Sequence, residues 1–139
     1  DDLQRMAVER RVITLPSGRE YAFPDARWTK YGTATHRTSI CNYPVQGFAT
    51  ADLLPIALVA LEKVVRDSGV RSVICNTVHD SIVMDVHPDE KDICIEMMKH
   101  AMLSLPFETV RRYGVTYDMP VGIEIKAGKN WLDLHEVEL

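Results

Sequence analysis

Two strand-like segments that are separated by only three residues constrain the fold of this chain most strongly. Ser72–Val78 and Ile82–Val86 are rich in β-branched residues, and between them lie His79, Asp80 and Ser81. Two such segments with so short a connection predict a tight antiparallel hairpin. Both are apolar on both faces at several positions, so we expect this sheet to be covered on both sides.

Longer segments on either side of the hairpin predict two helices. The first begins at about Thr50 or Asp52, with Asp52 as its N-cap, and runs to Ser68. Its apolar residues lie on nearly every side, which is typical of a central helix. The second begins at Pro88, because proline fits the first helical position, and runs to about Leu105.

Shorter segments complete a predicted α+β fold. Arg11–Leu15 and Arg19–Phe23 are strand-like and flank the turn residues Pro16–Gly18, and Pro24–Thr38 is an irregular polar loop. Val121–Ile125 alternates apolar and polar residues, as a half-buried strand does. The order of hairpin, helix, hairpin, helix and strand predicts an antiparallel sheet, made of a hairpin and the C-terminal strand, that packs against two main helices.

Size and charge limit the function classes. The chain has 139 residues, enough for a single domain, and a net charge of −4. A module that only coats nucleic acid is usually strongly basic, so this charge argues against one. Residues 1–40 carry seven Lys or Arg against five Asp or Glu, whereas residues 41–139 carry nine against fifteen. A basic arm on an acidic body suits a protein that contacts phosphate and holds metal, although chance produces the same asymmetry.

Other compositional features indicate the compartment. No apolar run approaches the roughly 18 residues that a membrane-spanning helix needs, and no signal peptide is recognisable. Cys41, Cys75 and Cys94 are odd in number and form no CxxC pair, which is typical of reduced, buried thiols. We therefore expect a cytoplasmic protein without a membrane partner.

Asp80 at the hairpin tip is the first candidate for chemistry. A rigid turn would hold its carboxylate in a fixed position, and two-metal phosphoryl-transfer sites need such oxygen ligands for Mg²⁺. Asp is also a common turn residue, so the hairpin alone leaves a purely structural role open. His79 beside it suits a phosphate or sugar contact, a metal ligand or a turn residue.

Two further groups suit nucleic-acid binding. Asn42 and Gln46 flank Pro44 ahead of the first predicted helix. Their amides could donate to acceptors in a DNA minor groove, or could cap the loop and the start of the helix. The mixture of Arg, Lys, Trp and Tyr from Arg27 to Arg37 could bind a single-stranded or duplex backbone, although loops often have this composition.

Taken in this order, the segments resemble the C-terminal palm segment of a DNA-polymerase-I-type (family A) DNA polymerase, and most of all its phage members. The resemblance covers almost the whole chain. It rests on the Gly-Arg hairpin that follows the fingers, the motif ahead of the long palm helix, motif C, and the C-terminal palm strand and tail. In that order, the matching segments are Pro16–Arg19, Asn42–Asp52, Val78–Val83 and Pro120–Trp131.

The resemblance implies roles for individual residues. Asp80 would coordinate a catalytic pair of Mg²⁺ ions, and His79 would lie against the 3′-terminal nucleotide of the primer in the same catalytic site. Asn42 and Gln46 would contact the minor groove of the primer–template DNA. Arg37, one residue from a position where the family often has arginine, is the remaining DNA-binding candidate. The implied reaction is in-line attack of the primer 3′-hydroxyl on the α-phosphate of a dNTP.

Besides the shifted position of Arg37, the chain departs from the family pattern at two places. Ser81 follows Asp80 where many members have Glu, so an accessory carboxylate is absent. One extra residue lies between Gln46 and Asp52 compared with the commonest spacing, which predicts a local bulge.

The resemblance also implies a partner. The other metal-binding Asp, in motif A, and the fingers helix that binds dNTP lie upstream in family members. Because the chain starts at Asp1 without an initiator Met, we expect a fragment or split product that needs the N-terminal polymerase part with fingers, motif A and thumb. Residues 1–40 would be the post-fingers hairpin and loop, and residues 41–139 the palm. One carboxylate cannot hold two Mg²⁺ ions in register, so the chain alone is expected to be inactive.

Two other interpretations remain at this point. A non-catalytic palm remnant would expose an unpaired sheet edge and an apolar patch, and would form homo-oligomers through them. An unrelated small metal-dependent hydrolase is disfavoured, because no second carboxylate or His cluster has metal-ligand spacing.

Overall fold

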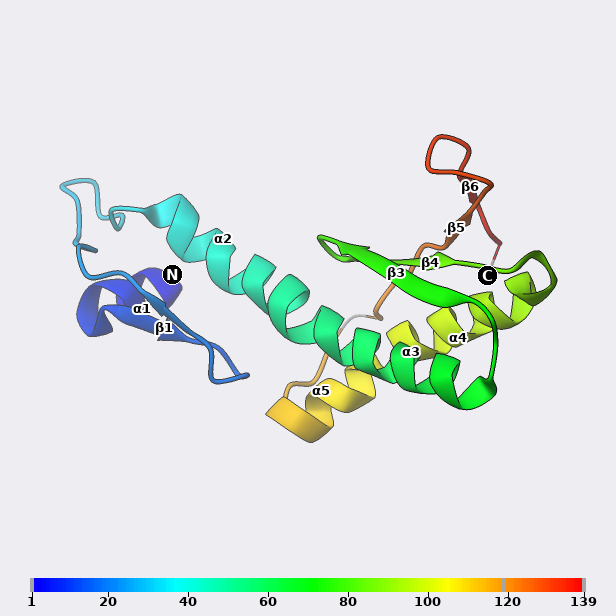
Figure 1. The fold of residues 1–139 in the computed structure, drawn as a ribbon. Coiled ribbons are helices and arrows are strands. Elements are labelled where there is room, and N and C mark those ends of the chain that lie inside the picture. Colours follow the sequence, from blue (N-terminus) through cyan, green and yellow to red (C-terminus); the bar gives the residue numbers. More distant parts are fainter. Residues whose placement is uncertain (1, 119, 139) are drawn as a thin grey trace. The chain divides into compact units, whose positions relative to one another are not determined.

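The computed structural model describes residues 2–118 and 120–138 and has the α+β fold that the sequence predicts (Figure 1). The described strands form two-stranded antiparallel sheets, each a hairpin of neighbouring strands. No helix in the described ranges is long and apolar enough to cross a membrane.

Contacts within the chain divide it into two units. The N-terminal unit comprises Asp1–Pro55 and Thr109–Val115, and the C-terminal unit comprises Ile56–Glu108 and Thr116–Leu139. Each unit therefore draws on two separate stretches of sequence. The prediction that residues 1–139 form a single domain stays a prediction.

The N-terminal unit contains the first predicted hairpin. Helix α1 (Asp2–Arg10) precedes strands β1 (Val12–Thr14) and β2 (Glu20–Ala22), and helix α2 (Arg37–Gly47) follows the loop after them. Gly18, with a φ of 84°, supplies the left-handed residue in the turn between the strands, so this prediction is confirmed.

A small apolar core holds these elements together. Residues from α1, the hairpin, the following loop and α2 contribute to it. The buried members are Ala7, Ile13, Phe23, Ala26, Ala34 and Ile40. The second stretch of the unit is joined to the first by the rings of Phe48 and Tyr113, whose centroids lie 6.0 Å apart.

The first long helix starts earlier than the sequence predicts. Asn42 and Gln46, expected in a loop, lie inside α2, and helical structure continues through the π-helical segment η1 (Phe48–Leu53) into α3 (Leu54–Ser68). The predicted start at Thr50 or Asp52 is therefore wrong. Proline inside the motif favoured a loop, because proline lacks the N–H that a helix interior uses. Here the helix tolerates that missing hydrogen bond.

The π-helical segment accounts for the extra residue in the motif. Single π turns interrupt α-helices and accommodate one additional residue locally. The predicted bulge between Gln46 and Asp52 is thereby confirmed. Pro55 has no N–H to donate to the Ala51 carbonyl, and that carbonyl accepts instead from Nη2 of Arg19 at 3.4 Å.

The C-terminal unit contains the second predicted hairpin and helix. Strands β3 (Val73–Val78) and β4 (Ser81–Asp85) pair antiparallel, and a 3-10 turn, η2 (Pro88–Glu90), leads into α4 (Lys91–Leu103). The hairpin packs on α3 and α4 around a buried cluster of Leu61, Met97 and Ala101.

A further helix, α5 (Leu105–Tyr113), follows α4 directly and was not predicted. Pro106 interrupts the helical pattern of the sequence. In the structure this proline lies in the first turn of the new helix, where a missing N–H costs little.

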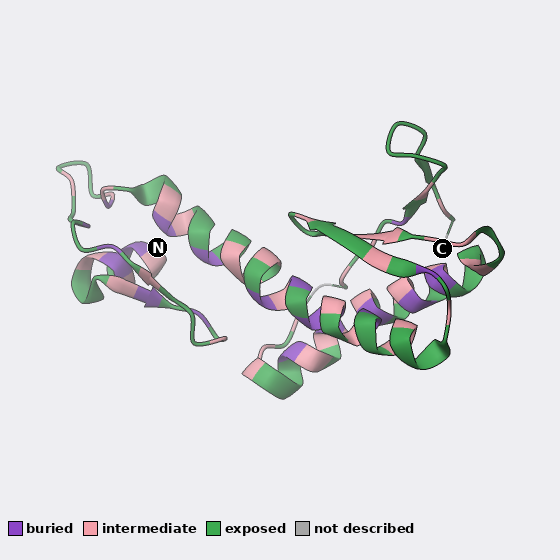
Figure 2. Cartoon of the chain, viewed as in Figure 1, coloured by how far each residue is buried: buried purple, intermediate pink, exposed green. Residues whose placement is uncertain are grey.

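The β3–β4 sheet is not covered on both sides, contrary to the prediction. Ile74, Ile82 and Met84 pack against the cluster between α3 and α4. Val73, in contrast, keeps 53% of its surface exposed, and Thr77 on the same strand is also exposed (Figure 2). The apolar pattern of the strands therefore overestimates their burial.

The predicted C-terminal strand does not join the hairpin sheet. Val121–Ile125 shows the expected alternation of burial but forms no strand in the described part of the chain. Instead β5 (Lys126–Ala127) pairs with β6 (His135–Glu136). Apolar alternation reports which side chains are buried, whereas a strand also requires a partner backbone in register. The fold class is thus right and the composition of the sheet is wrong.

Candidate functional site

A two-residue connection places His79 and Asp80 at the exposed tip of the β3–β4 hairpin. Val78 and Ser81 form the last pair of the strands, and both tip residues are exposed. His79 has a φ of 54°, a left-handed conformation that non-glycine residues seldom adopt. The Ser81 hydroxyl donates to the Val78 carbonyl at 2.8 Å and closes the turn. The predicted hairpin and the position of Asp80 at its tip are therefore confirmed.

A bulge shapes the strand that leads to this tip. The register shifts between Ile74 and Asn76, which leaves Cys75 as the bulged residue. Its thiol donates to the Val83 carbonyl at 3.5 Å. Bulges increase the local twist of a hairpin and re-aim the side chains beyond them, so this one helps to set the direction of the tip.

Glu90 anchors the base of the hairpin. Its carboxylate accepts hydrogen bonds from the backbone N–H groups of Arg71 at 3.0 Å and Ser72 at 2.9 Å, and from the Ser72 hydroxyl at 2.7 Å. The Ser72 hydroxyl is the largest cause, and the Arg71 N–H the next, of a pKa of Glu90 lowered from 4.5 to about 2. In the sequence, Glu90 lies in the first turn of the helix that is predicted to begin at Pro88. The residues next to Glu90 give no indication that it contacts Ser72 and Arg71, which lie 18 and 19 positions earlier in the sequence.

Asn42 and Gln46 share one face of α2. They are four residues apart in a helix, so their side chains lie one turn above each other, and both are exposed. The predicted loop around them is wrong. The helix places both amides on one surface, which a loop would not ensure. The amides therefore form a pair of neighbouring donors on a regular scaffold.

Arg37 does not share that face. It is the first residue of α2 and is exposed. It lies five positions before Asn42, which is a rotation of about 140° around the helix axis. Thr38, in contrast, lies one turn before Asn42 on the same face. The helix thus brings together Asn42 and Gln46 and leaves Arg37 on another side.

A buried carboxylate ties the helix to the first hairpin. Asp52, in η1, accepts from Nε of Arg19 at 3.0 Å and from the Ser17 hydroxyl at 2.7 Å. The Asp52 carboxylate raises the pKa of the Arg19 guanidinium above its usual value, through the hydrogen bond first and the charge second. Asp52 is therefore an internal anchor and not the N-cap that the sequence predicts.

Gly47 permits a close approach between the helix and strand β2. A Cβ atom at this position would overlap the hydroxyl and ring of Tyr21. The Tyr21 ring also lies 6.3 Å from the ring of Tyr43, one helical turn earlier. This packing fixes the rotation of α2 and with it the direction in which Asn42 and Gln46 point.

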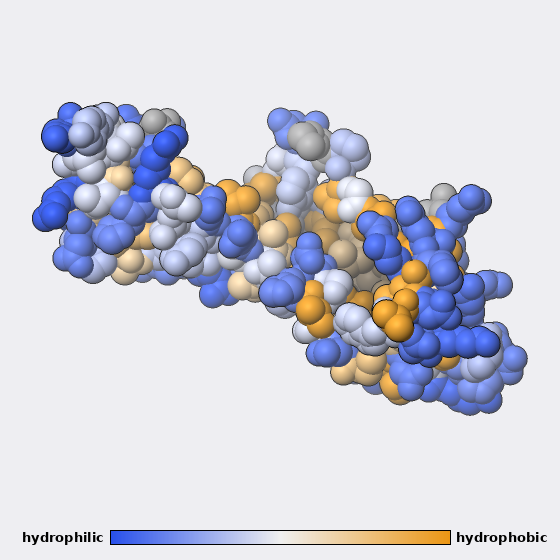
Figure 3. All heavy atoms as spheres, turned by 90° about the horizontal axis from the view of Figure 1, so that it is seen from above, coloured by the Kyte–Doolittle hydropathy of each residue, from blue (hydrophilic) through white to orange (hydrophobic). Residues whose placement is uncertain are grey.

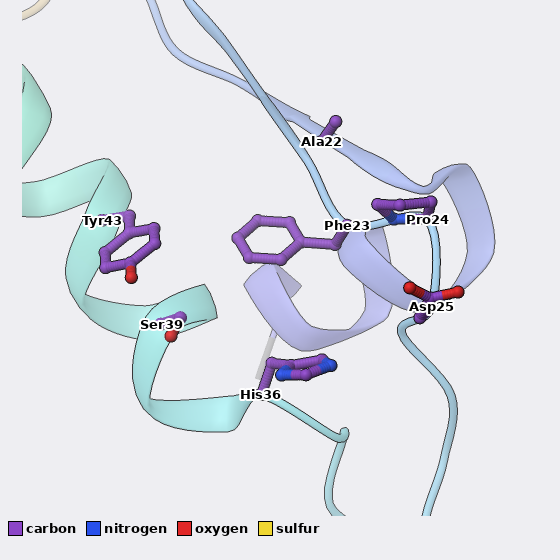
Figure 4. Close-up of a pocket in the computed structure, with 7 residues that line it drawn as sticks. All are labelled: Ala22, Phe23, Pro24, Asp25, His36, Ser39 and Tyr43. Carbon is purple, nitrogen blue, oxygen red and sulfur yellow. The ribbon is translucent and has the colours of Figure 1, made fainter.

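A hollow of about 290 Å³ lies beside the start of α2 in the N-terminal unit. Figure 4 shows the rings of Phe23, His36 and Tyr43 around it. Asp25 and Ser39 add polar groups to its wall. The hollow is open and shallow, and its lining residues include no predicted site residue.

The Asp80 carboxylate can supply one of the several ligands that a Mg²⁺ site needs. Mg²⁺ takes oxygen ligands, and an exposed carboxylate on a rigid turn suits it. Within residues 2–118 and 120–138, no group of three or more His, Cys, Asp or Glu side chains is arranged to hold a metal ion. The cysteines are free; Cys94 is buried, whereas Cys75 is exposed, which corrects the expectation that all three are buried.

Sequence comparison gives a family match for nearly the whole chain. Residues 1–133 match the family model described as DNA polymerase family A. A DNA polymerase of Bacillus phage SP01 is 37% identical over 98 residues, which cover 70% of this chain and 10% of that protein. DNA polymerase I of Pseudomonas aeruginosa is 30% identical over 132 residues, which cover 93% of this chain and 13% of that protein.

Structure comparison agrees with these matches. The chain is similar to a solved structure described as the POL domain of Pol1 from M. smegmatis in complex with DNA primer-template and dNTP. The TM-score is 0.62 with 25% sequence identity, over 75% of this chain and 18% of that chain. The chain thus spans between about a tenth and a fifth of the length of these relatives.

Proposed function

Because the chain belongs to DNA polymerase family A, we propose that residues 1–139 are the C-terminal palm part of a template-directed DNA polymerase that adds dNTPs to a primer 3′ end. The family match and the named relatives support this proposal. The observation that carries it is the exposed Asp80 at the tip of a hairpin that is anchored at its base by Glu90 and by packing on α3 and α4.

Asp80 is the metal ligand in this proposal. Mg²⁺, when bound, supplies charge stabilisation for phosphoryl transfer, and Asp80 would hold it together with a carboxylate from the N-terminal polymerase part. The stiff hairpin keeps the Asp80 carboxylate in place, so little reorganisation is needed when substrate arrives. His79, held at a left-handed backbone angle beside it, would contact the terminal nucleotide of the primer.

Asn42 and Gln46 are the minor-groove donors in this proposal. All four base pairs present acceptors in the minor groove, and an amide can donate to them whatever the sequence. Two amides one helical turn apart can contact successive positions of the duplex, which suits an enzyme that must accept any template. Arg37 would contact the phosphate backbone, since it lies on a different side of the helix.

The 139-residue chain is expected to show no primer extension by itself. Asp80 is one carboxylate, and the described residues offer no cluster of metal ligands around it. The proposal therefore requires the N-terminal polymerase part as a partner, with primer–template DNA and dNTP as substrates.

The experiment that tests the proposal is a chimera with a matching relative. Residues 1–139 replace the corresponding C-terminal segment of the Pseudomonas aeruginosa DNA polymerase I. We expect Mg²⁺-dependent dNTP incorporation on a primed template, and loss of incorporation on chelation of the metal. A chimera that is folded by circular dichroism and binds primer–template DNA, yet incorporates no nucleotide, would contradict the proposal.

Exposed apolar surface on the C-terminal unit favours a second function, self-association as a non-catalytic palm remnant. The β3–β4 hairpin has two strands, so each strand keeps an outer edge without a partner strand in the described part of the chain. Large hydrophobic residues also lie on the surface of this unit, as Figure 3 shows in part. The most exposed are Val59, Phe107, Trp131 and Leu132.

Sizing by light scattering over a hundredfold range of concentration separates the two functions. A concentration-dependent dimer of the purified chain, together with an inactive chimera, would favour the remnant. A monomer would argue against the sheet edge as a contact surface.

A further inference from the structure

A rigid loop in the N-terminal unit exposes aromatic rings next to positive charge. We propose that this loop, Arg27–Thr35, binds single-stranded DNA by stacking unpaired bases on Trp28 and Tyr31. The proposal rests on the proposed function only in naming DNA as the ligand. The loop lies outside the hairpin tip and outside the helix face of Asn42 and Gln46.

Hydrogen bonds hold the 27–35 loop in one conformation. Trp28 and Ala34 form an antiparallel bridge, and the Thr29 N–H donates to the Thr33 carbonyl at 2.8 Å. Gly32, with a φ of 73°, completes the turn at the end of the loop. A loop that is already ordered loses little conformational entropy on binding, so its exposed rings can serve as a platform.

A buried side chain fixes this loop to the body of its unit. The Ala34 N–H donates to Oε1 of Gln4 at 2.8 Å, and Gln4 is 1% exposed. At the loop's first residue, the Arg27 N–H donates to the Thr35 hydroxyl at 3.1 Å. The two ends of the loop are therefore held together, and Gln4 ties one of them to α1.

The rings themselves face solvent. Tyr31 keeps 79% of its surface exposed and Trp28 keeps 46%. Nζ of Lys30 lies 5.0 Å from the centre of the Tyr31 ring. Aromatic rings of this kind stack on bases of any sequence, and a neighbouring cation attracts the phosphate that follows each base.

Local charge is complementary to a polyanion even though the whole chain is acidic. Residues 26–51 contain Arg27, Lys30 and Arg37 and no Asp or Glu, whereas the chain carries a net charge of −4. A positive stretch attracts nucleic acid locally even when the whole chain is acidic. The rings can stack only on unpaired bases. A duplex exposes its backbone and groove edges but keeps the faces of its bases stacked inside.

The two tryptophans of the chain allow a direct measurement. The variant Trp131→Phe leaves Trp28 as the only tryptophan. We expect its fluorescence to be quenched when oligothymidylate of about 12 nucleotides is added at low salt, because a base stacked on the indole quenches its emission. The matched variant Trp28→Phe, which keeps Trp131, should show no quenching at the same concentrations.

Further variants separate stacking from attraction by charge. In the Trp131→Phe background, Tyr31→Ala should weaken the affinity for oligothymidylate about tenfold, because one stacking partner is lost. Lys30→Ala should weaken it less and should flatten the dependence on salt. Tyr31 is so exposed that its replacement should not disturb the fold, which circular dichroism can verify.

Several outcomes would overturn the inference. Equal quenching by inorganic polyphosphate would show that charge alone is responsible, equal affinity for a duplex of the same length would assign a backbone contact, and tighter binding of oligouridylate would assign RNA. The variant Asp80→Asn should leave the quenching unchanged. A failure at the loop and a failure of the proposed polymerase role are therefore distinguishable.

Discussion

The carboxylate of Asp52 lies 2.9 Å from Nη2 of Arg19, with 6% of the Asp52 side chain and 43% of the Arg19 side chain exposed. The pair joins two segments 33 residues apart in the sequence, the turn of the first hairpin and the π-helical segment. Asp52 is the buried member of this pair. The loss of a charge-assisted hydrogen bond to its carboxylate should therefore destabilise the chain more than the loss of one at the surface.

Asp52→Asn should therefore lower the free energy of unfolding by about 1–3 kcal/mol, because an amide cannot accept equally well from both Arg19 and Ser17. Denaturation by urea, followed by circular dichroism, measures this change. Asp67→Asn is the matched control, since Asp67 is exposed and its ion pair with Arg66 is 3.7 Å long. The control should stay within about 0.5 kcal/mol of the parent chain. Equal effects of the two substitutions would show that Asp52 is not an anchor.

Gly47→Ala should destabilise the chain by about 1–3 kcal/mol, because the added methyl group would overlap Tyr21. Combined with Tyr21→Ala, the same substitution should become neutral or stabilise by up to about 1 kcal/mol, since alanine favours a helix more than glycine does. A double-mutant cycle in urea measures this coupling. Additive effects of the two substitutions would contradict the close approach of Gly47 and Tyr21.

Deletion of Ala49 should leave a cooperatively folding chain, with a loss of no more than about 1 kcal/mol, because the π turn can revert to an α turn. Deletion of Ala60 is the contrasting case. It would rotate the rest of α3 by about 100° and turn apolar residues away from the core cluster. Thermal unfolding compares the two deletions. A broad, non-cooperative transition after deletion of Ala49 would argue that the chain does not tolerate removal of the extra residue in the π segment.

Glu90 should make the chain sensitive to acid within a defined range. Its pKa is about 2 in the folded chain and 4.5 for the free group, so the unfolded chain binds the proton more readily. The free energy of unfolding should then fall as the pH is lowered from about 4.5 to about 2, and this contribution is fully present above that range.

The variant Glu90→Gln should lack this part of the pH dependence, so that the stability advantage of the parent chain over it shrinks toward pH 2. Urea titrations at a series of pH values measure both. Glu96→Gln on the exposed side of α4 is the control, because Glu96 lies 3.8 Å from Lys99 and should keep the parent slope. Parallel pH profiles of Glu90→Gln and the parent would refute the anchoring role.

Asp80→Asn in the chimera should lower dNTP incorporation by a hundredfold or more, because metal ions supply several kcal/mol of charge stabilisation in phosphoryl transfer. Asp85→Asn is a matched control on the same hairpin, since Asp85 is also exposed and lies at the far end of β4 from the tip. It should retain activity within about twofold. Similar losses of incorporation in both variants would show that the cause is a less stable hairpin and not the loss of metal binding.

Local patterns predicted the β3–β4 hairpin and the two helices that pack against it. Strand propensity and a short connection are properties of neighbouring residues, so the hairpin between Ser72 and Val86 is predictable without knowledge of the residues that pack against it. The same approach misplaced the start of the first long helix, because Pro44 signals a boundary locally while the tertiary packing of Gly47 against Tyr21 favours a continuous helix.

Contacts between distant residues were beyond the sequence. Nothing near Glu90 or Asp52 indicates that Ser72 and Arg19 bind them, because both carboxylates lie at predicted helix starts, where acidic residues are common. The failure to foresee that Val121–Ile125 stays outside the hairpin sheet has the same cause, since register is a property of two segments. The residue types and positions of Asp80, His79, Asn42 and Gln46 made them candidates, the family resemblance gave them specific roles, and these roles stay proposals.

The N-terminal unit is completed by Thr109–Val115, which the ribosome delivers after α3, the β3–β4 hairpin and α4. Nascent chains begin to fold as they emerge, so the cluster around Leu61 and Met97 can assemble while Phe48 still lacks its ring partner Tyr113. Within residues 1–139, the unit whose synthesis begins first is therefore the unit that is completed last. A nascent chain paused before residue 109 should leave α2 more sensitive to proteolysis than the finished protein does.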